Sequence, residues 1–157
     1  LIKGAHPHII AQIKEATRDG LRAVSNVIQD KHLLPGAGAI EVMCHSALMK
    51  YKETVTGRAK LGVQTYADGL LVIPKTLAEN SGYAAQASMS KLQEAHAAGQ
   101  SSNGFDIDSG EPVAPRTAGI WDNYRVVRQM LDSSAIISAQ LLLVDEVIRA
   151  GKQMKKG

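Results

Sequence analysis

Residues 7–38 read PHIIAQIKEATRDGLRAVSNVIQDKHLLPGAG, and this stretch indicates the fold class. Its apolar residues recur at three- and four-residue steps, which is typical of an amphipathic helix. They are Ile9, Ile10, Ile13, Leu21, Val24, Val27 and Ile28. Pro7 suits a first helical turn, because its missing N–H would be unpaired there in any case. We expect a helix over residues 7–30, ended by the proline and glycines of residues 35–38.

The rest of the chain also has a mainly helical pattern. We expect helices over residues 39–51, 57–80, 84–98 and 124–150, with Pro74 kinking or splitting the second of these. Asp108-Ser109-Gly110-Glu111 is a turn signal between two short segments and predicts a small β-hairpin within residues 105–115. Because residues 135–144 are apolar nearly all round, we expect the last helix in the core. The predicted fold is mainly α, with long helices and one hairpin.

Composition narrows the function classes. The 157 residues fit one domain and carry 18 Lys and Arg against 15 Asp and Glu, a net charge of +3. No segment concentrates basic residues and aromatic residues are few, which argues against nucleic-acid binding. The longest uncharged run, residues 133–144, is shorter than the ~20 residues of a membrane helix, so we expect no membrane association. The single cysteine, Cys44, fits a reducing compartment and predicts a cytoplasmic location.

The first residues, Leu1-Ile2-Lys3-Gly4, resemble the end of a strand, without an initiator Met or a signal-peptide pattern. We therefore expect the chain to be a fragment of a longer protein. The basic segment Lys152 to Gly157 is expected to be a flexible tail.

A glycine-rich turn, Pro35-Gly36-Ala37-Gly38-Ala39, precedes the second helix. Such a turn allows a ligand to approach the backbone and the helix dipole together. It matches neither common nucleotide motif, because Glu41 stands where a dinucleotide fingerprint needs glycine and no Gly-Lys-Ser/Thr follows. Taken alone, the motif is explained as well by a turn between two helices.

Three further positions allow a functional and a structural interpretation. Asp19 lies about 140° around its helix from the centre of the apolar stripe, where a carboxylate is ordinarily a solvated surface group. Asp122 follows Gly119-Ile120-Trp121 just before the last helix, where an acidic residue often serves as the N-cap. Asn103-Gly104 is an ordinary turn dipeptide. Cys44 and His45 point about 100° apart on a helix, and no cluster has metal-ligand spacing, so no metal site is predicted.

In their order and spacing, several strings together resemble group II chaperonins over almost the whole chain. They are Asp19-Gly20-Leu21, Leu34-Pro35-Gly36-Ala37-Gly38-Ala39-Ile40-Glu41, Gly57-Arg58, Ile73-Pro74-Lys75-Thr76-Leu77-Ala78-Glu79-Asn80-Ser81-Gly82, Gly119-Ile120-Trp121-Asp122-Asn123 and Leu143-Val144-Asp145-Glu146. Pro-Gly-Ala-Gly-Ala and Trp-Asp-Asn look like the variants of one subunit of the eukaryotic cytosolic chaperonin, CCT/TRiC. The resemblance implies that residues 1–16 end an intermediate domain and that residues 17–151 form the C-terminal half of the equatorial, ATP-binding domain.

The resemblance also implies roles for individual residues. Asp19 matches the carboxylate that activates the water attacking the γ-phosphate. Gly36, Ala37 and Gly38 match the loop against the sugar and base of the nucleotide. Asn103 and Gly104 match the turn beside the adenine, and Asp122 matches the acidic residue that accepts the ribose hydroxyls. Val127 stands where many members carry a lysine.

As a whole, the implied function is ATP-driven folding of client proteins, such as cytoskeletal proteins, within a hetero-oligomeric double ring of chaperonin subunits. ATP or ADP with Mg²⁺ is the implied cofactor, with the magnesium ligands and the client-binding apical domain outside this sequence. We expect the chain alone to be inactive as an ATPase and to self-associate through exposed apolar surface. The alternative is a helical scaffold or interaction module that binds no nucleotide.

Overall fold

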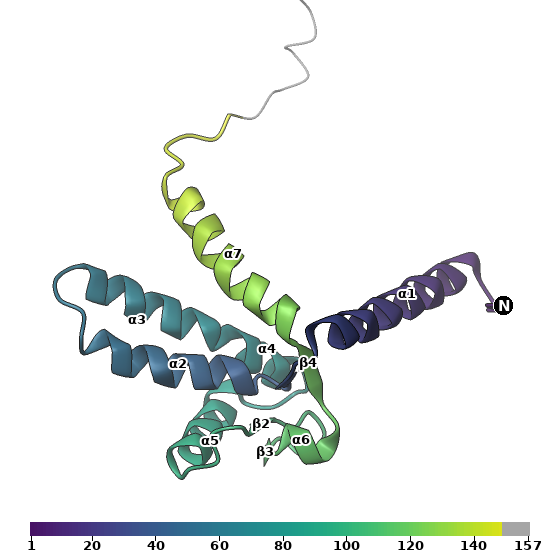
Figure 1. The fold of residues 1–157 in the computed structure, drawn as a ribbon, viewed down its shortest axis with the longest axis horizontal. Helices are drawn as coiled ribbons and strands as arrows, with labels where there is room; N and C mark the ends of the chain where they lie inside the picture. Colours follow the sequence, from purple (N-terminus) through teal and green to yellow (C-terminus); the bar gives the residue numbers. More distant parts are fainter. Residues whose placement is uncertain (149–157) are drawn as a thin grey trace, which may run out of the picture.

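Helices dominate the computed structural model, which describes residues 1–148 (Figure 1). The helices are α1 (Pro7–Asp30), α2 (Ala39–Lys52), α3 (Ala59–Leu70), α4 (Val72–Asn80), α5 (Ala85–Ala97), α6 (Pro115–Ala118) and α7 (Tyr124–Leu142). The strands are β1 (Leu33–Pro35), β2 (Gly104–Phe105), β3 (Pro112–Val113) and β4 (Trp121–Asn123). Strands β2 and β3 pair antiparallel, which confirms the predicted mainly α fold with one hairpin.

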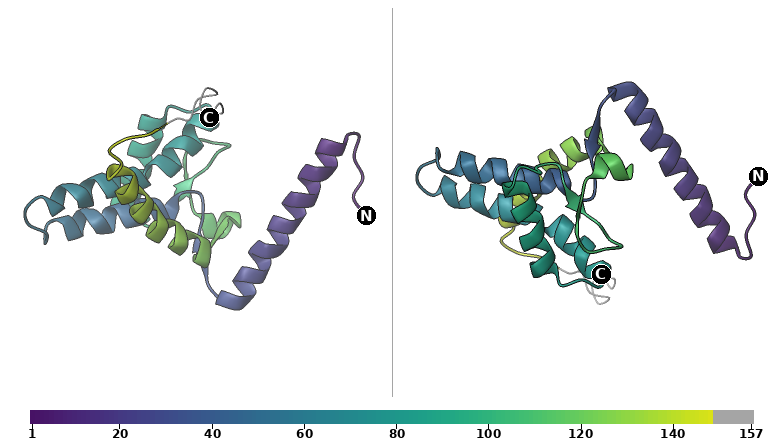
Figure 2. Two further views of the ribbon diagram at one scale, coloured as in Figure 1. Left: turned by 90° about the horizontal axis from the view of Figure 1, so that it is seen from above. Right: turned by 90° about the horizontal axis from the view of Figure 1, so that it is seen from below.

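Helix α1 stands apart from the rest of the molecule in every view (Figures 1 and 2). Both ends of the helix are capped by neighbouring residues. The His6 ring accepts a hydrogen bond from the His8 N–H at the N-terminus, and Lys31 takes a left-handed conformation at the C-terminus. No residue of α1 is buried, and its apolar stripe faces solvent, with Leu21 and Ile28 each 69% exposed. The periodicity therefore predicted the helix correctly, although the stripe has no covering partner within residues 1–148.

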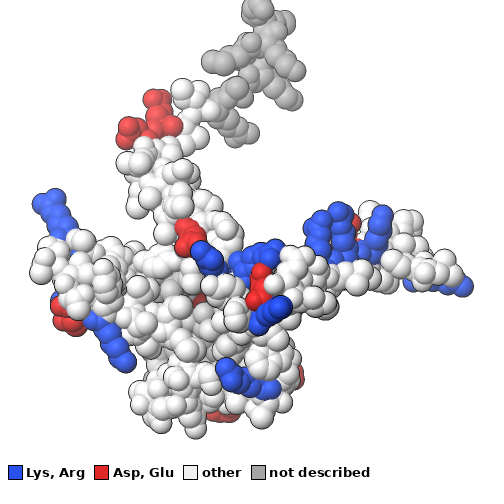
Figure 3. Space-filling model, in the orientation of Figure 1, with Lys and Arg blue, Asp and Glu red and all other residues white. Residues whose placement is uncertain are grey.

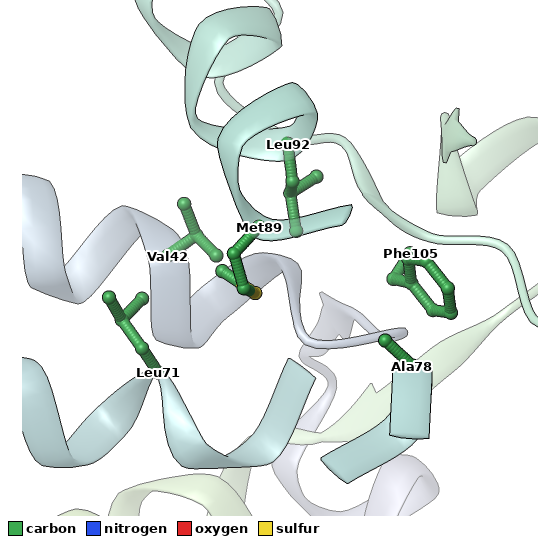
Figure 4. Packing of buried hydrophobic residues seen from close by; sticks show 6 residues of the cluster. All are labelled: Val42, Leu71, Ala78, Met89, Leu92 and Phe105. Atoms are coloured by element: carbon green, nitrogen blue, oxygen red, sulfur yellow. The ribbon is translucent and has the colours of Figure 1, made fainter. Parts of the chain in front are cut away.

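The core lies where α2, α4, α5 and β2 meet (Figure 4). Its buried members are Val42, Leu71, Ala78, Met89, Leu92 and Phe105. The Tyr83 ring packs edge-on against Phe105, with the ring centroids 5.8 Å apart. Because Phe105 belongs to β2, the hairpin is fixed directly to the helical core.

The predicted helix over residues 57–80 is divided, although not at Pro74. The break falls at Leu71, whose N–H bonds to the Asp68 carbonyl in a tight turn. Pro74 lies buried in the first turn of α4, where its missing N–H costs no intrahelical bond. Gly82 has φ +82°, which confirms the predicted left-handed residue after this helix.

The predictions for the last helix are partly wrong. Helix α7 ends at Leu142 rather than at residue 150, and residues 149–157, including the predicted tail, lie outside the described residues. Its apolar segment is exposed instead of buried, with Ile136 60% and Leu142 87% accessible. The physical reason is that α7 packs mainly through its beginning, against β4 and α1, so its second half has few neighbours.

Two further points concern the ends and the surface of the chain. Residues 1–4 form no strand, because a strand needs a hydrogen-bonded partner and none lies beside them in the part of the chain described. Across residues 1–148, we find no helix with the length and hydropathy required to cross a bilayer.

Candidate functional site

A two-stranded ladder that the sequence did not predict brings distant segments together. Strand β1 pairs antiparallel with β4, and Leu34 stands opposite Asp122. Each strand has three residues, too few to show an alternating pattern. The N-cap of α7 is Asn123 rather than Asp122, so the capping explanation for Asp122 is wrong.

Gly36 continues from β1 and lies directly against Asp122. Its N–H donates to the Ile120 carbonyl at 3.1 Å. A Cβ added to Gly36 would lie 3.3 Å from Asp122 Oδ1 and 3.1 Å from Ile120 Cγ2. Glycine at this position therefore allows the backbone to approach the carboxyl group closely.

The next two residues of the loop both have left-handed backbone conformations. Ala37 has φ +58°, unusual for a residue with a side chain, and Gly38 has φ +75°. A Cβ on Gly38 would come within 2.8 Å of Pro74 Cβ, so α4 excludes a side chain there. The structure thus explains glycine at 38 and shows that Ala37 introduces a methyl group into a tight turn.

The hairpin closes this loop from the other side. The Ala37 carbonyl accepts a hydrogen bond of 2.8 Å from the Phe105 N–H. Gly104 is buried, and a Cβ there would lie 2.6 Å from both the Cβ and the carbonyl oxygen of Ala37. Asn103 precedes Gly104, and its amide donates to Gln100 Oε1 at 3.0 Å. Six of the predicted site residues therefore converge from three separate segments of the chain. They are Gly36, Ala37 and Gly38 of the loop, Asn103 and Gly104 before the hairpin, and Asp122 on β4.

Asp19 is the one predicted site residue that lies elsewhere. It is exposed in the middle of α1, about 16 Å along the helix from Asp30 at 1.5 Å per residue. Among the described residues it makes no hydrogen bond or ion pair that would anchor it. Since α1 points away from the body (Figure 1), this structure does not bring Asp19 to the loop.

A buried carboxyl group that the sequence analysis did not select completes the cluster. Glu41, in the first turn of α2, is only 4% exposed. Burial raises the pKa of Glu41 and also that of Asp122. The sequence signal was an acidic residue in the first helical turn after a glycine-rich loop, but that signal is also typical of exposed helix starts.

The cysteine and histidine side chains discussed above do not form a reactive pair in the described residues. Cys44 is half-buried, and burial raises its thiol pKa, which opposes nucleophilic reactivity. His45 Nε2 lies 3.6 Å from Asp68 Oδ1 rather than beside the cysteine. Over residues 1–148, no group of three or more His, Cys, Asp or Glu side chains could hold a metal ion.

A separate apolar groove of about 780 Å³ runs between α7 and the α3–α4 corner. Small residues on both sides line much of it, including Gly62, Gly69, Ser138 and Ala139. At its base the Tyr66 hydroxyl donates to the Leu131 carbonyl at 2.8 Å. Figure 3 shows that α7 carries few charged side chains on the visible face.

The family model of the TCP-1/cpn60 chaperonin family matches residues 1–152. T-complex protein 1 subunit zeta-2 of Mus musculus is 52% identical over 151 residues, which cover 96% of this chain and 28% of that protein. The Homo sapiens zeta-2 subunit is 49% identical over 156 residues, covering 99% of this chain and 29% of that protein. The chain thus spans less than a third of the length of these relatives. The Pro-Gly-Ala-Gly-Ala and Trp-Asp-Asn motifs resemble those of the zeta subunit, and both of these relatives are zeta subunits.

Among solved structures, the open-state monomer of a group II chaperonin from Methanococcoides burtonii superposes with a TM-score of 0.76. It is 29% identical, and the match covers 90% of this chain and 35% of that one. The predicted resemblance in sequence and fold is therefore confirmed.

Proposed function

Because the chain belongs to the TCP-1/cpn60 chaperonin family, we propose that it forms the C-terminal part of the equatorial, ATP-binding domain of a cytosolic chaperonin subunit. Residues 1–16 would end the intermediate domain and residues 17–151 would belong to the equatorial domain. The whole subunit would fold client proteins by ATP hydrolysis in a hetero-oligomeric double ring.

The convergence of the loop, the hairpin start and Asp122 is the observation that carries this proposal. Gly36 and Gly104 are buried, and the absence of a side chain at each lets the loop, the hairpin start and β4 approach one another closely. Asp122 adds a carboxyl group beside that backbone, and a carboxylate accepts hydrogen bonds from vicinal hydroxyl groups. The arrangement fits the nucleoside half of ATP or ADP.

The phosphate half of the nucleotide needs groups from elsewhere. No described residue cluster suits Mg²⁺, and the sequence contains no Gly-Asp-Gly-Thr-Thr string. Magnesium would neutralise charge on the phosphates when bound. We therefore assign the magnesium ligands to other parts of the subunit. Asp19 would act on the γ-phosphate only when α1 lies over the nucleotide.

Photolabelling with an azido-adenine nucleotide tests the site. We expect rings containing the full-length subunit to be labelled on the peptide that carries Asn103 and Gly104, because that turn would lie beside the adenine. Excess unmodified ADP should abolish the label. Labelling confined to other peptides, or no labelling, would contradict the site and favour the scaffold alternative.

The chain alone serves as the matched control. In calorimetry with magnesium ATP we expect no tight binding by residues 1–157, since the phosphate-binding groups are absent. Submicromolar affinity of the isolated chain would show that the nucleoside contacts suffice and would contradict the division proposed above.

The exposed apolar surface of α7 is the observation that favours the scaffold alternative. It predicts that the isolated chain associates with further copies of itself. Ile136, Ile137 and Leu141 on α7 are 60%, 54% and 68% exposed, and apolar patches of this kind mark contact surfaces. We expect dimers or larger species in sedimentation velocity, and a shift toward monomer when Ile137 and Leu141 are replaced by Ser. A dye-silent monomer at high concentration would contradict this expectation.

A further inference from the structure

His96, in the last turn of α5, is hydrogen-bonded to the turn that begins the hairpin. Its ring Nε2 lies 2.6 Å from the carbonyl oxygen of Asn103, and the contact is partly buried. Because a carbonyl oxygen can only accept a hydrogen bond, Nε2 is the donor. The bond therefore sets the position of the Asn103 backbone relative to the end of α5.

Gln100 holds the same residue through two further hydrogen bonds. The Asn103 N–H donates to the Gln100 carbonyl at 3.1 Å, and Asn103 Nδ2 donates to Gln100 Oε1 at 3.0 Å. The chain can leave α5 in this direction because Gly99 has φ +94°, a conformation that favours glycine. Asn103 is thus held at its carbonyl, its N–H and its side chain.

The turn connects the core to the glycine-rich loop. On one side, α5 is fixed in the core by Leu92, which is fully buried. On the other side, Gly104 lies against Ala37, and the Phe105 N–H donates to the Ala37 carbonyl at 2.8 Å. The His96 hydrogen bond therefore joins a rigid helix to the part of the hairpin that contacts the loop.

We propose that His96 is a positioning residue for nucleotide binding, whose Nε2–H holds the Asn103–Gly104 turn in place beside the adenine base. A turn that is already ordered loses less conformational freedom when a ligand binds, and this raises affinity. The histidine acts through the turn and not on the nucleotide itself. For its ligand this inference rests on the proposed function, whereas the restraint on the turn does not.

Amide hydrogen exchange in the 157-residue chain tests the restraint without any nucleotide. The N–H groups of Asn103 and Phe105 are both hydrogen-bonded. We expect them to exchange faster in His96→Ala, because local opening of the turn then costs less free energy. His96→Gln keeps a side-chain N–H donor and should restore slow exchange.

Glu94→Ala is the matched control for exchange. Glu94 is exposed on the same helix, and its carboxylate accepts a hydrogen bond from Ser90 instead of contacting the turn. Its removal should leave the exchange of residues 103–105 unchanged. Unchanged exchange in His96→Ala, or the same acceleration in Glu94→Ala, would overturn the restraint. Faster exchange spread equally over α2 would indicate loss of folding and would also overturn a local restraint.

Nucleotide affinity in rings containing the full-length subunit tests the positioning role. ADP competes with the azido-adenine label on the peptide that carries Asn103, so its affinity is measured at this site. We expect its dissociation constant to rise by roughly 2- to 12-fold in His96→Ala, the range for one net hydrogen bond. His96→Gln should recover most of this loss. The hydrolysis rate at saturating ATP should be spared.

Ribose 5-triphosphate, which lacks the base, separates positioning from a general structural role. It should compete with the label equally well in His96→Ala and in the unmodified subunit, because the turn would contact only the base. Equal losses for this probe and for ADP would overturn the positioning role, as would faster exchange with unchanged ADP affinity. If unmodified rings are not labelled, the proposed function fails and the nucleotide role of His96 fails with it. The exchange experiment distinguishes that result from failure of the restraint.

Discussion

Replacing Asp19 by Ala in the full-length subunit is expected to lower the rate of ATP hydrolysis by about 10²-fold or more, the range for loss of a positioned general base. The side chain is exposed on α1 and, among the described residues, contacts no core group. The free energy of unfolding should therefore change by no more than about 0.5 kcal/mol. Single-turnover hydrolysis at saturating ATP, in rings carrying one variant subunit, measures the effect.

Glu15→Ala is the matched control, since Glu15 is exposed one helical turn away on the same helix. It should leave the hydrolysis rate unchanged. Unchanged turnover in Asp19→Ala would show that the role implied by the family does not apply to this subunit. Equal losses in both variants would indicate a general electrostatic effect of α1 rather than a positioned base.

The sequence predicted helices well where local signals were strong. Pro7 at the start of α1 and Gly82 after α4 have local causes, so both positions were correct. The exposure of Ile136 and Leu142 could not be predicted, because burial depends on which elements pack against a helix and not on its own apolar content. An apolar helix predicts that a partner exists, but not that the partner lies in the same 157 residues.

In the candidate site, too, features with local causes could be predicted from the sequence and long-range contacts could not. The sequence predicts turns at Gly36 and Gly104. It does not predict that Gly104 lies against Ala37 and the Gly36 carbonyl, because that contact depends on the hairpin packing against the loop. Asp122 faces Gly36 because β4 pairs with β1, a long-range pairing of segments too short to be recognised. The burial of Glu41 could not be predicted from its neighbours in the sequence, because it arises from the elements that pack around the start of α2.

Asp122 should separate nucleotide binding from hydrolysis. Its backbone pairs with Leu34 in the β1–β4 ladder, and this pairing does not involve the side chain. In the full-length subunit, Asp122→Ala should weaken ADP affinity by about 1–3 kcal/mol through loss of a charged hydrogen bond to the ribose. This corresponds to a roughly 5- to 150-fold higher dissociation constant. The rate of the chemical step at saturating ATP should be spared.

Stability distinguishes this loss from misfolding. Burial raises the pKa of Asp122 above its unfolded value of 3.8, so its ionisation opposes folding increasingly as pH rises from that value through the folded pKa. Removing the carboxyl group should therefore not destabilise the subunit at neutral pH through loss of charge. Asp132→Ala, at an exposed position on α7, is the control and should leave ADP affinity unchanged. Equal ADP affinity in Asp122→Ala and in the unmodified subunit would exclude Asp122 from the nucleotide site. A large fall in its thermal unfolding temperature would instead assign the side chain to the packing of β4 against the loop.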